Sequence, residues 1–146
     1  MIFLASDHAG LELKNSLVEY LKKNRELEDL GTFSAESTDY PDYAARCCEK
    51  VLSRKGSFGI LICGTGIGMS IAANKFKGIR AAAVSEELSA RMAREHNHCQ
   101  ILCMGARVIS VEKAVECVEA FLGATPDNGE RHLRRIEKIH QLEKNL

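Results

Sequence analysis

The residues with the clearest chemical potential form a glycine loop around Cys63. The segment Gly59–Ser70 reads GILICGTGIGMS: an apolar run of strand type ends at Cys63, and a loop with glycine at every second position follows. A strand that enters such a loop and then a helix directs backbone N–H groups to one point, where the helix dipole favours an anion. Because Cys63 stands beside that helix N-terminus, its thiol should ionise more readily than a free thiol. The segment therefore predicts a base next to a site for a developing oxyanion.

Two other interpretations of this loop are a nucleotide-binding site and a simple tight turn. Its spacing differs from the dinucleotide pattern G-x-G-x-x-G and from a P-loop, which ends in Gly-Lys-Ser/Thr, so nucleotide binding is disfavoured. The plainer alternative is that the glycines only make a tight turn and that Cys63 is an inert buried thiol. The segment alone leaves that alternative open.

Composition limits the class of protein. The chain has 146 residues, 45% of them hydrophobic, and a formal net charge of zero. We expect one domain over residues 1–146 and no nucleic-acid partner, because a chain-wide basic footprint is missing. No apolar run reaches membrane-spanning length, and the first residues follow a strand pattern rather than that of a signal peptide, so we expect a cytoplasmic protein with no membrane partner. The six cysteines contain no C-x-x-C pair and are expected to be reduced thiols without a metal.

Apolar periodicity predicts strands that alternate with helices along the whole chain. This favours an α/β fold: a doubly wound, Rossmann-like, five-stranded parallel sheet with helices on both faces and a C-terminal helix. In such sheets ligands bind beyond the carboxyl ends of the strands. The expected strands are 2–6, 27–30, 59–63, 80–84 and 101–104, and the expected helices are 10–23, 41–54, 67–76, 86–97, 111–122 and 130–144.

Asp7 and His8 follow the first expected strand directly. An aspartate before a helix is often only an N-cap, which satisfies free backbone N–H groups. Two such side chains together at a strand end nevertheless favour a site.

His96 and Asn97 stand at the end of an expected helix. His96 comes four residues after Met92, on the helix face that points inward. A lone histidine there is more often part of the core than a catalyst, although Asn97 follows where a site would open. The run His96–Cys99 is a poor metal cluster, because neighbouring side chains diverge.

Cations near the end of the chain could bind a phosphate. Arg131 and Arg135 share one helix face at i, i+4 spacing, and Arg107 follows the fifth strand. The plainer interpretation of these arginines is a solvated basic surface, as for most runs of charged residues. The alternative is a phosphate-binding site, for which the guanidinium fork is well suited.

Many ordered motifs across the chain resemble the family of ribose-5-phosphate isomerase type B, which also holds galactose-6-phosphate isomerase subunits. The motifs are Ser6-Asp7-His8-Ala9-Gly10, Gly31-Thr32, Thr38-Asp39-Tyr40-Pro41, Ile62–Gly68, Ala72–Lys75, Gly78–Ala81, His96-Asn97, Gly105-Ala106-Arg107 and Arg131-His132.

The resemblance implies interconversion of an aldose phosphate and a ketose phosphate through a cis-enediolate, in the non-oxidative pentose phosphate pathway, without metal or cofactor. Cys63 matches the base that moves a proton between C2 and C1. His96 matches the residue that opens the furanose ring, with Asp7 at the other side. Thr65 would move a proton between the two oxygens. The loop that stabilises the enediolate matches Gly64, Thr65, Gly66, Ile67 and Gly68.

The same resemblance implies the binding residues and the assembly. Sugar-binding positions match Asp7, His8, Tyr40 and Asn97, and phosphate-binding positions match Arg107, Arg131 and Arg135, with His8 near them. The family builds each site across a dimer interface, so a homodimer or a dimer of dimers is expected, with a small sugar phosphate as ligand.

Three features of the sequence indicate how this chain compares with the branches of the family. One branch of the family uses a glutamate base where this chain has Met69, which cannot take a proton, so the cysteine branch applies. Cys63 and the pair His96-Asn97 occur together, so one chain can form complete sites as a homo-oligomer. The segment Thr125–Glu130 departs from the Gly-Gly that often precedes Arg131 in relatives, which could shift the phosphate arginines.

Two rival functions remain at this point. The first is an isomerase of a six-carbon sugar phosphate such as allose 6-phosphate. The second is a non-catalytic module that binds a sugar phosphate on the same fold. A binding module has no need of a reactive thiol, which disfavours it.

Overall fold

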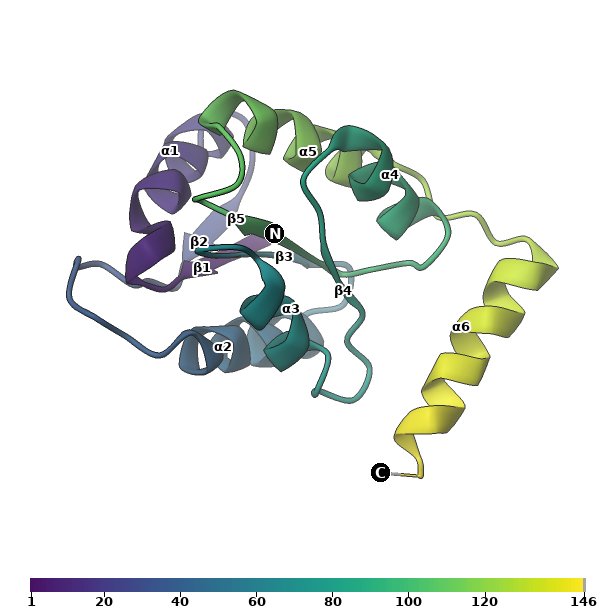
Figure 1. Ribbon diagram of the computed structural model, residues 1–146. Helices are drawn as coiled ribbons and strands as arrows, with labels where there is room; N and C mark the ends of the chain where they lie inside the picture. The colour runs from purple at the N-terminus through teal and green to yellow at the C-terminus, as the bar shows by residue number, and fades with distance from the viewer. Residues whose placement is uncertain (146) are drawn as a thin grey trace.

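A computed structural model, which describes residues 1–145, contains one five-stranded sheet in which every strand pairing is parallel (Figure 1). The strand order is β2-β1-β3-β5-β4. This confirms the predicted doubly wound α/β fold. The strands are β1 (Ile2–Ser6), β2 (Leu27–Asp29), β3 (Phe58–Cys63), β4 (Ala81–Ala83) and β5 (Ile101–Gly105).

Helices cover both faces of the sheet, as the sequence predicted. The helices α1, α4 and α5 pack on one face and α2 and α3 on the other, while α6 stands apart from the sheet (Figure 1). None of the helices within residues 1–145 is long and apolar enough to cross a bilayer. The helices are the 3₁₀ turn η1 (His8–Gly10), α1 (Leu11–Leu21), α2 (Tyr40–Ser53), α3 (Ile67–Ala73), α4 (Glu87–Glu95), α5 (Val111–Gly123) and α6 (Glu130–Glu143).

The central strands β1, β3 and β5 are buried on both sides. Every residue of β1 and β5 is buried, as are five of the six residues of β3. A parallel strand covered by helices on both faces reads as a continuous apolar run rather than an alternating one, which is why these three segments were recognisable in the sequence.

Two helices end earlier than their apolar pattern suggests. The helix α3 ends at Ala73, where the Asn74 amide donates to the Ser70 carbonyl oxygen at 2.9 Å. The helix α4 ends at Glu95, and His96 is its C-cap, with its backbone N–H donating to Met92. His96 and Asn97 thus lie at and just beyond the helix end rather than within it.

The topology assigns each loop to one edge of the sheet. Because all strands are parallel, each crossover helix returns the chain from the carboxyl edge to the amino edge. The segment before η1, the loop 64–66 and the residues after β5 lie at the carboxyl edge. The residues after α4 lie at the amino edge, where the Gln100 carbonyl accepts from the N–H of Gly59 near the start of β3 at 2.9 Å.

A buried ion pair fixes the edge strand and the loop that follows it. The side chain of Lys14 is fully buried, and its Nζ lies 2.7 Å from both carboxylate oxygens of Asp29. Asp29 Oδ1 also accepts from the Gly31 N–H at 2.9 Å. This contact anchors the start of the loop that leads to Thr38 and Tyr40.

Candidate active site

Cys63 ends β3 with its sulfur turned into the loop that follows. The Sγ atom accepts a hydrogen bond from the Gly66 N–H at 3.2 Å, and the residue is only 4% exposed. Gly66 has a φ of 82°, a conformation that favours glycine, and a Cβ there would lie 2.9 Å from the backbone of Met104. Thr65 Oγ1 accepts from the Ile67 N–H at 3.3 Å. The Gly66 N–H and the Thr65 side chain thus fix the sulfur and the first turn of the loop in place.

Asp7 and His8 lie beside this loop at the end of β1. The backbone N–H of Asp7 donates to the Ile62 carbonyl at 3.2 Å, which joins the ends of β1 and β3. The Asp7 carboxylate caps η1 by accepting from the Gly10 N–H at 3.1 Å, so the N-cap interpretation is confirmed. His8 Nδ1 accepts from the Thr38 N–H at 3.2 Å. A neutral His8 ring therefore carries its hydrogen on Nε2, as a donor for a ligand.

Gly64 and Gly68 have no Cβ, so side chains from other elements can lie directly against their backbone. A Cβ on Gly68 would lie 2.6 Å from the ring and 2.9 Å from the hydroxyl oxygen of Tyr40. A Cβ on Gly64 would lie 3.0 Å from Arg107 Nη1. The loop thus brings a phenol and a guanidinium against its own backbone.

A cavity of about 460 Å³ lies next to these residues, and His8 and Arg107 line it. A cavity of this volume is within the range of small-molecule sites. The carboxyl edge therefore gathers ten of the predicted residues. They are Asp7, His8, Tyr40, Cys63, Gly64, Thr65, Gly66, Ile67, Gly68 and Arg107, together with the unpredicted Thr38 as a support for His8.

Other cysteines are buried in surroundings that suppress ionisation. Burial raises the pKa of Cys48 to about 12 and that of Cys99 and Cys117 to about 11. Burial also raises the pKa of Cys47 and Cys103 well above the usual range. These five thiols are buried core residues, and their burial keeps them protonated near neutral pH.

The remaining predicted residues lie at the amino edge. His96 and Asn97 follow α4, and Arg131 and Arg135 lie on the first turns of α6. Asn97 lines a second cavity of about 490 Å³ between α6 and the β4 side of the sheet. The structure therefore does not bring His96, Asn97, Arg131 and Arg135 to Cys63 within one chain.

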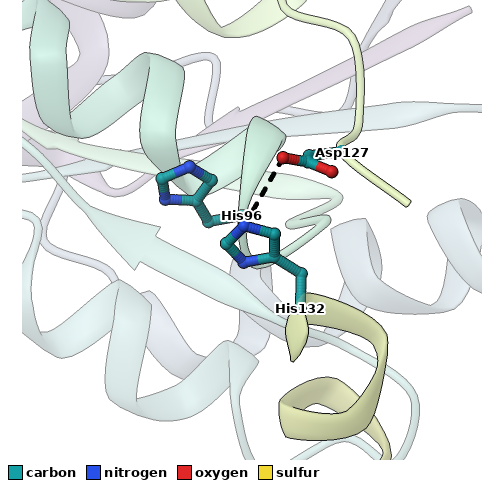
Figure 2. Close-up of side chains that lie close together, drawn as sticks. All are labelled: His96, Asp127 and His132. Atoms are coloured by element: carbon teal, nitrogen blue, oxygen red, sulfur yellow. Dashed lines mark ion pairs between the residues drawn. The ribbon is translucent and has the colours of Figure 1, made fainter. Parts of the chain in front are cut away.

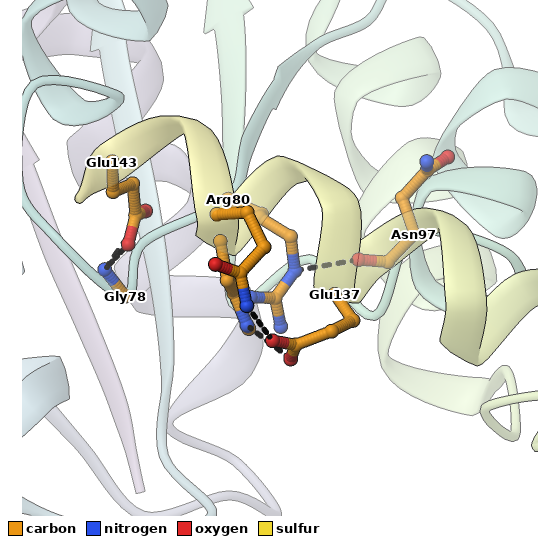
Figure 3. A network of polar contacts seen from close by, with 7 residues as sticks. Gly78, Arg80, Asn97, Glu137 and Glu143 are labelled. Carbon is orange, nitrogen blue, oxygen red and sulfur yellow. Dashed lines mark hydrogen bonds and ion pairs between the residues drawn. The ribbon is translucent and has the colours of Figure 1, made fainter. Parts of the chain in front are cut away.

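A network around Arg80 fixes this second group (Figure 3). The guanidinium donates to the backbone carbonyls of Asn97 at 2.8 Å and of His98 at 3.0 Å. On the other side, Nη1 lies 2.6 Å from His140 Nε2 of α6, and the Gly78 N–H donates to Glu143 at 3.1 Å. Arg80 thus ties the end of α4 to α6.

His96 belongs to a cluster that the sequence did not reveal. Its ring stacks on His132, with ring centroids 4.3 Å apart and planes 11° apart, and Asp127 lies beside them (Figure 2). Their ligand atoms lie within 4.8 Å of one another. A metal ion lies in the plane of the imidazole it binds, and two parallel stacked planes share no such point. The geometry therefore disfavours a common metal ion on these rings.

The fold and the loop define a class: a doubly wound α/β protein with a buried thiol at the end of a strand and a glycine loop directly after it. Comparison narrows the class further. Residues 2–139 match the model of the family described as ribose/galactose isomerase, and the chain belongs to that family.

Similar curated proteins cover nearly the whole chain. Ribose-5-phosphate isomerase B of Escherichia coli K12 is 46% identical over 143 residues, which are 97% of this chain and 95% of that protein. A probable ribose-5-phosphate isomerase B of Mycoplasma genitalium is 44% identical over 146 residues, with 98% and 95% covered.

Solved structures of ribose-5-phosphate isomerase B are similar to this chain over nearly its whole length. A ribose-5-phosphate isomerase B from Clostridium thermocellum superposes with a TM-score of 0.95 at 46% identity, covering 99% of this chain and 97% of that one. The Mycoplasma genitalium enzyme with bound ribulose-5-phosphate superposes with a TM-score of 0.93 at 43% identity, covering 99% and 97%.

Proposed function

We propose that this chain is an aldose–ketose isomerase that interconverts ribose 5-phosphate and ribulose 5-phosphate. The observation that carries the proposal is the thiol of Cys63, held at 3.2 Å by the Gly66 N–H at the mouth of a loop that can receive an oxyanion. The relatives that are 46% and 44% identical over nearly the whole chain bear the name of this activity.

The proton transfer uses Cys63 as the base. With the open-chain aldose bound, the thiolate removes the proton from C2, and the C2–H electron pair forms the C1–C2 double bond while the carbonyl oxygen at C1 becomes an oxyanion. The N–H groups of the glycine loop stabilise the cis-enediolate, a kind of contribution worth ~10²–10³-fold in rate. Thr65 moves a proton between O1 and O2, and the Cys63 thiol returns its proton to C1.

Ring opening precedes this step. His96 donates a proton to the ring oxygen of the furanose as the bond between C1 and that oxygen breaks, and Asp7 on the opposite side accepts the proton of the C1 hydroxyl as C1 becomes the carbonyl. Positioned acid–base catalysis of this kind contributes ~10²–10⁴-fold. Tyr40 and Asn97 bind sugar hydroxyls.

The phosphate is bound by cations from both groups of residues. His8 and Arg107 approach it from the carboxyl edge, and Arg131 and Arg135 complete the site. Guanidinium forks suit a phosphate, and this remote binding holds the reacting carbons in place.

A complete site needs two chains. Cys63 and His96 lie at opposite edges of one sheet, so we place Cys63 of one protomer opposite His96 of another. Apolar residues exposed on α3 and α6 support this assembly, since such surfaces mark interfaces when they are contiguous. They are Ile67, Ile71, Leu133, Ile139 and Leu142. We propose a homodimer or a dimer of dimers.

Backbone donors and arginines supply the charge stabilisation that a metal would otherwise give, so we propose metal-independent, cofactor-free chemistry. We also propose that residues 1–146 form one isomerase domain and that it acts in the cytoplasm, within the non-oxidative pentose phosphate pathway.

The test is turnover by the purified protein in excess EDTA. Ribose 5-phosphate and allose 6-phosphate are compared as substrates by their kcat/KM values. Faster EDTA-insensitive conversion of ribose 5-phosphate supports the proposal. A higher kcat/KM with allose 6-phosphate would show that the preferred substrate is the six-carbon sugar phosphate. Binding of either sugar without turnover would show that the protein is a binding module and not an enzyme.

A further inference from the structure

The ring of His96 is supported by a second histidine. His132, in the first turn of α6, packs face to face on His96 with the ring centroids 4.3 Å and the planes 11° apart (Figure 2). His132 is 4% exposed. The stack therefore covers one face of the His96 ring with a side chain that has little freedom of its own.

Asp127 meets the His132 ring at its edge. Asp127 Oδ2 lies 3.5 Å from His132 Nε2. The carboxylate is itself fixed, since its Oδ1 accepts from the Gly129 N–H at 2.8 Å and its backbone N–H donates to the Glu95 carbonyl at 2.8 Å. The end of α4, the segment before α6 and the first turn of α6 are thereby joined around the two rings.

We propose that His132, packed on His96 and bounded at its edge by Asp127, is a positioning residue that fixes the plane of the His96 ring for ring opening. This inference rests on the proposed role of His96 in that step. His132 has no role in the proton transfers described above, and this proposal gives it one.

The surroundings of His132 disfavour its protonated form. Burial lowers the pKa of His132, the nearby His96 lowers it further, Asp127 opposes the change, and Arg131 and Arg135 lower it again. These are the charged groups that face the ring from α4, from the segment before α6 and from α6 itself. The lowered pKa of His132 disfavours a second positive charge beside the His96 ring.

Packing rather than a tight hydrogen bond holds the His132 ring. Its Nε2 is buried and, among the described residues, has no hydrogen-bond partner of good geometry, because the contact with Asp127 is long. A planar ring of similar size should therefore serve in its place. This separates a role in positioning from a role in proton transfer.

The experiment compares His132→Ala and His132→Phe with the wild-type enzyme, with Arg134→Ala on the exposed side of α6 as a matched control. Two measurements are made. NMR of the His96 ring in the free protein reports the stack through its ring-current shift and ring order. Steady-state kinetics with ribose 5-phosphate give kcat, KM and the pH profile.

In His132→Ala we expect the His96 signal to lose its stacking shift and kcat to fall ~10–100-fold, with KM little changed, because a small misplacement of a reacting group has such an effect. In His132→Phe we expect the stacking shift, most of kcat and the shape of the pH profile to return. Arg134→Ala should match the wild type in both measurements.

An unchanged His96 signal in His132→Ala would overturn the proposal, and so would a changed signal without loss of kcat. A pH profile in His132→Phe that has lost its acidic or its basic limb would also overturn it, because His132 would then take part in proton transfer. Absence of turnover in the wild type would instead reject the proposed function. The NMR measurement would then still decide whether His132 orients His96.

Discussion

If each site takes Cys63 from one chain and His96 from another, two inactive variants should restore activity when they are combined. The variants are Cys63→Ala and His96→Gln. Each alone alters both sites of a symmetric dimer, so each should be inactive. In a heterodimer, one site receives both substitutions and the other receives the native Cys63 and the native His96.

The geometry of the sheet and the symmetry of a dimer set how much activity the combined variants should restore. Along β3, Gly59 and Cys63 are four residues apart, about 13 Å at the usual rise of a strand, and the chain after His96 joins the Gly59 end. One furanose cannot bridge that separation within a chain. Equal mixing gives about half heterodimers, each with one of two sites intact, and thus about one quarter of wild-type kcat per chain.

The assay combines the two variants under different affinity tags by co-expression and measures ribose 5-phosphate turnover. The heterodimer purified through both tags should reach about one half of the wild-type value. As a control, Cys63→Ala combined with Thr65→Ala should stay inactive, since both substitutions fall in the same half of the site. Heterodimers verified by native mass spectrometry but without activity would refute the shared site.

Three further outcomes are expected. Arg135→Ala should raise KM about tenfold with little change in kcat, as expected when a phosphate contact made equally in the ground and transition states is lost. Lys14→Met should lower the free energy of unfolding by about 2–4 kcal/mol in urea titrations, because it strands the Asp29 carboxylate. Iodoacetamide at pH 8 should inactivate by labelling Cys63, whereas Cys48, whose pKa burial raises to about 12, stays protonated and unlabelled.

Each of these outcomes has a matched comparison. Arg134→Ala should leave KM unchanged, and an equal rise would show a general disturbance of α6. Lys22→Met removes an exposed pair with Glu19 and should change stability by less than about 1 kcal/mol. For alkylation, an inactivating label found by mass spectrometry on any cysteine other than Cys63 would contradict the expected reactivity.

The parts of the fold that were predictable are those whose pattern is local. Apolar runs such as the one ending at Cys63 identify buried parallel strands, and the glycine loop identifies the strand-to-helix turn. Helix ends were less predictable. His96 continues the apolar pattern of α4, yet the chain leaves the helix there, and His98 takes a positive φ of 48°.

The spatial grouping of the site was not readable from spacing. Arg107 and Arg135 are both cations near predicted site segments, but the parallel topology places them at opposite edges of the sheet. The contact between Asp127 and His132, and their approach to His96, depend on how α6 turns back after α5. No local periodicity encodes that turn. A site shared between two chains stays a prediction from the resemblance to the family.

The role of Cys63 as the base is tested most directly by proton exchange in D₂O. Wild-type enzyme and Cys63→Ala are each incubated with ribose 5-phosphate, and the recovered sugars are analysed by mass spectrometry and NMR at C1 and C2. We expect the wild type to form ribulose 5-phosphate and to exchange solvent deuterium into the sugar. Cys63→Ala should bind the substrate but show neither process. Conversion or exchange by Cys63→Ala at near wild-type rates would contradict the account.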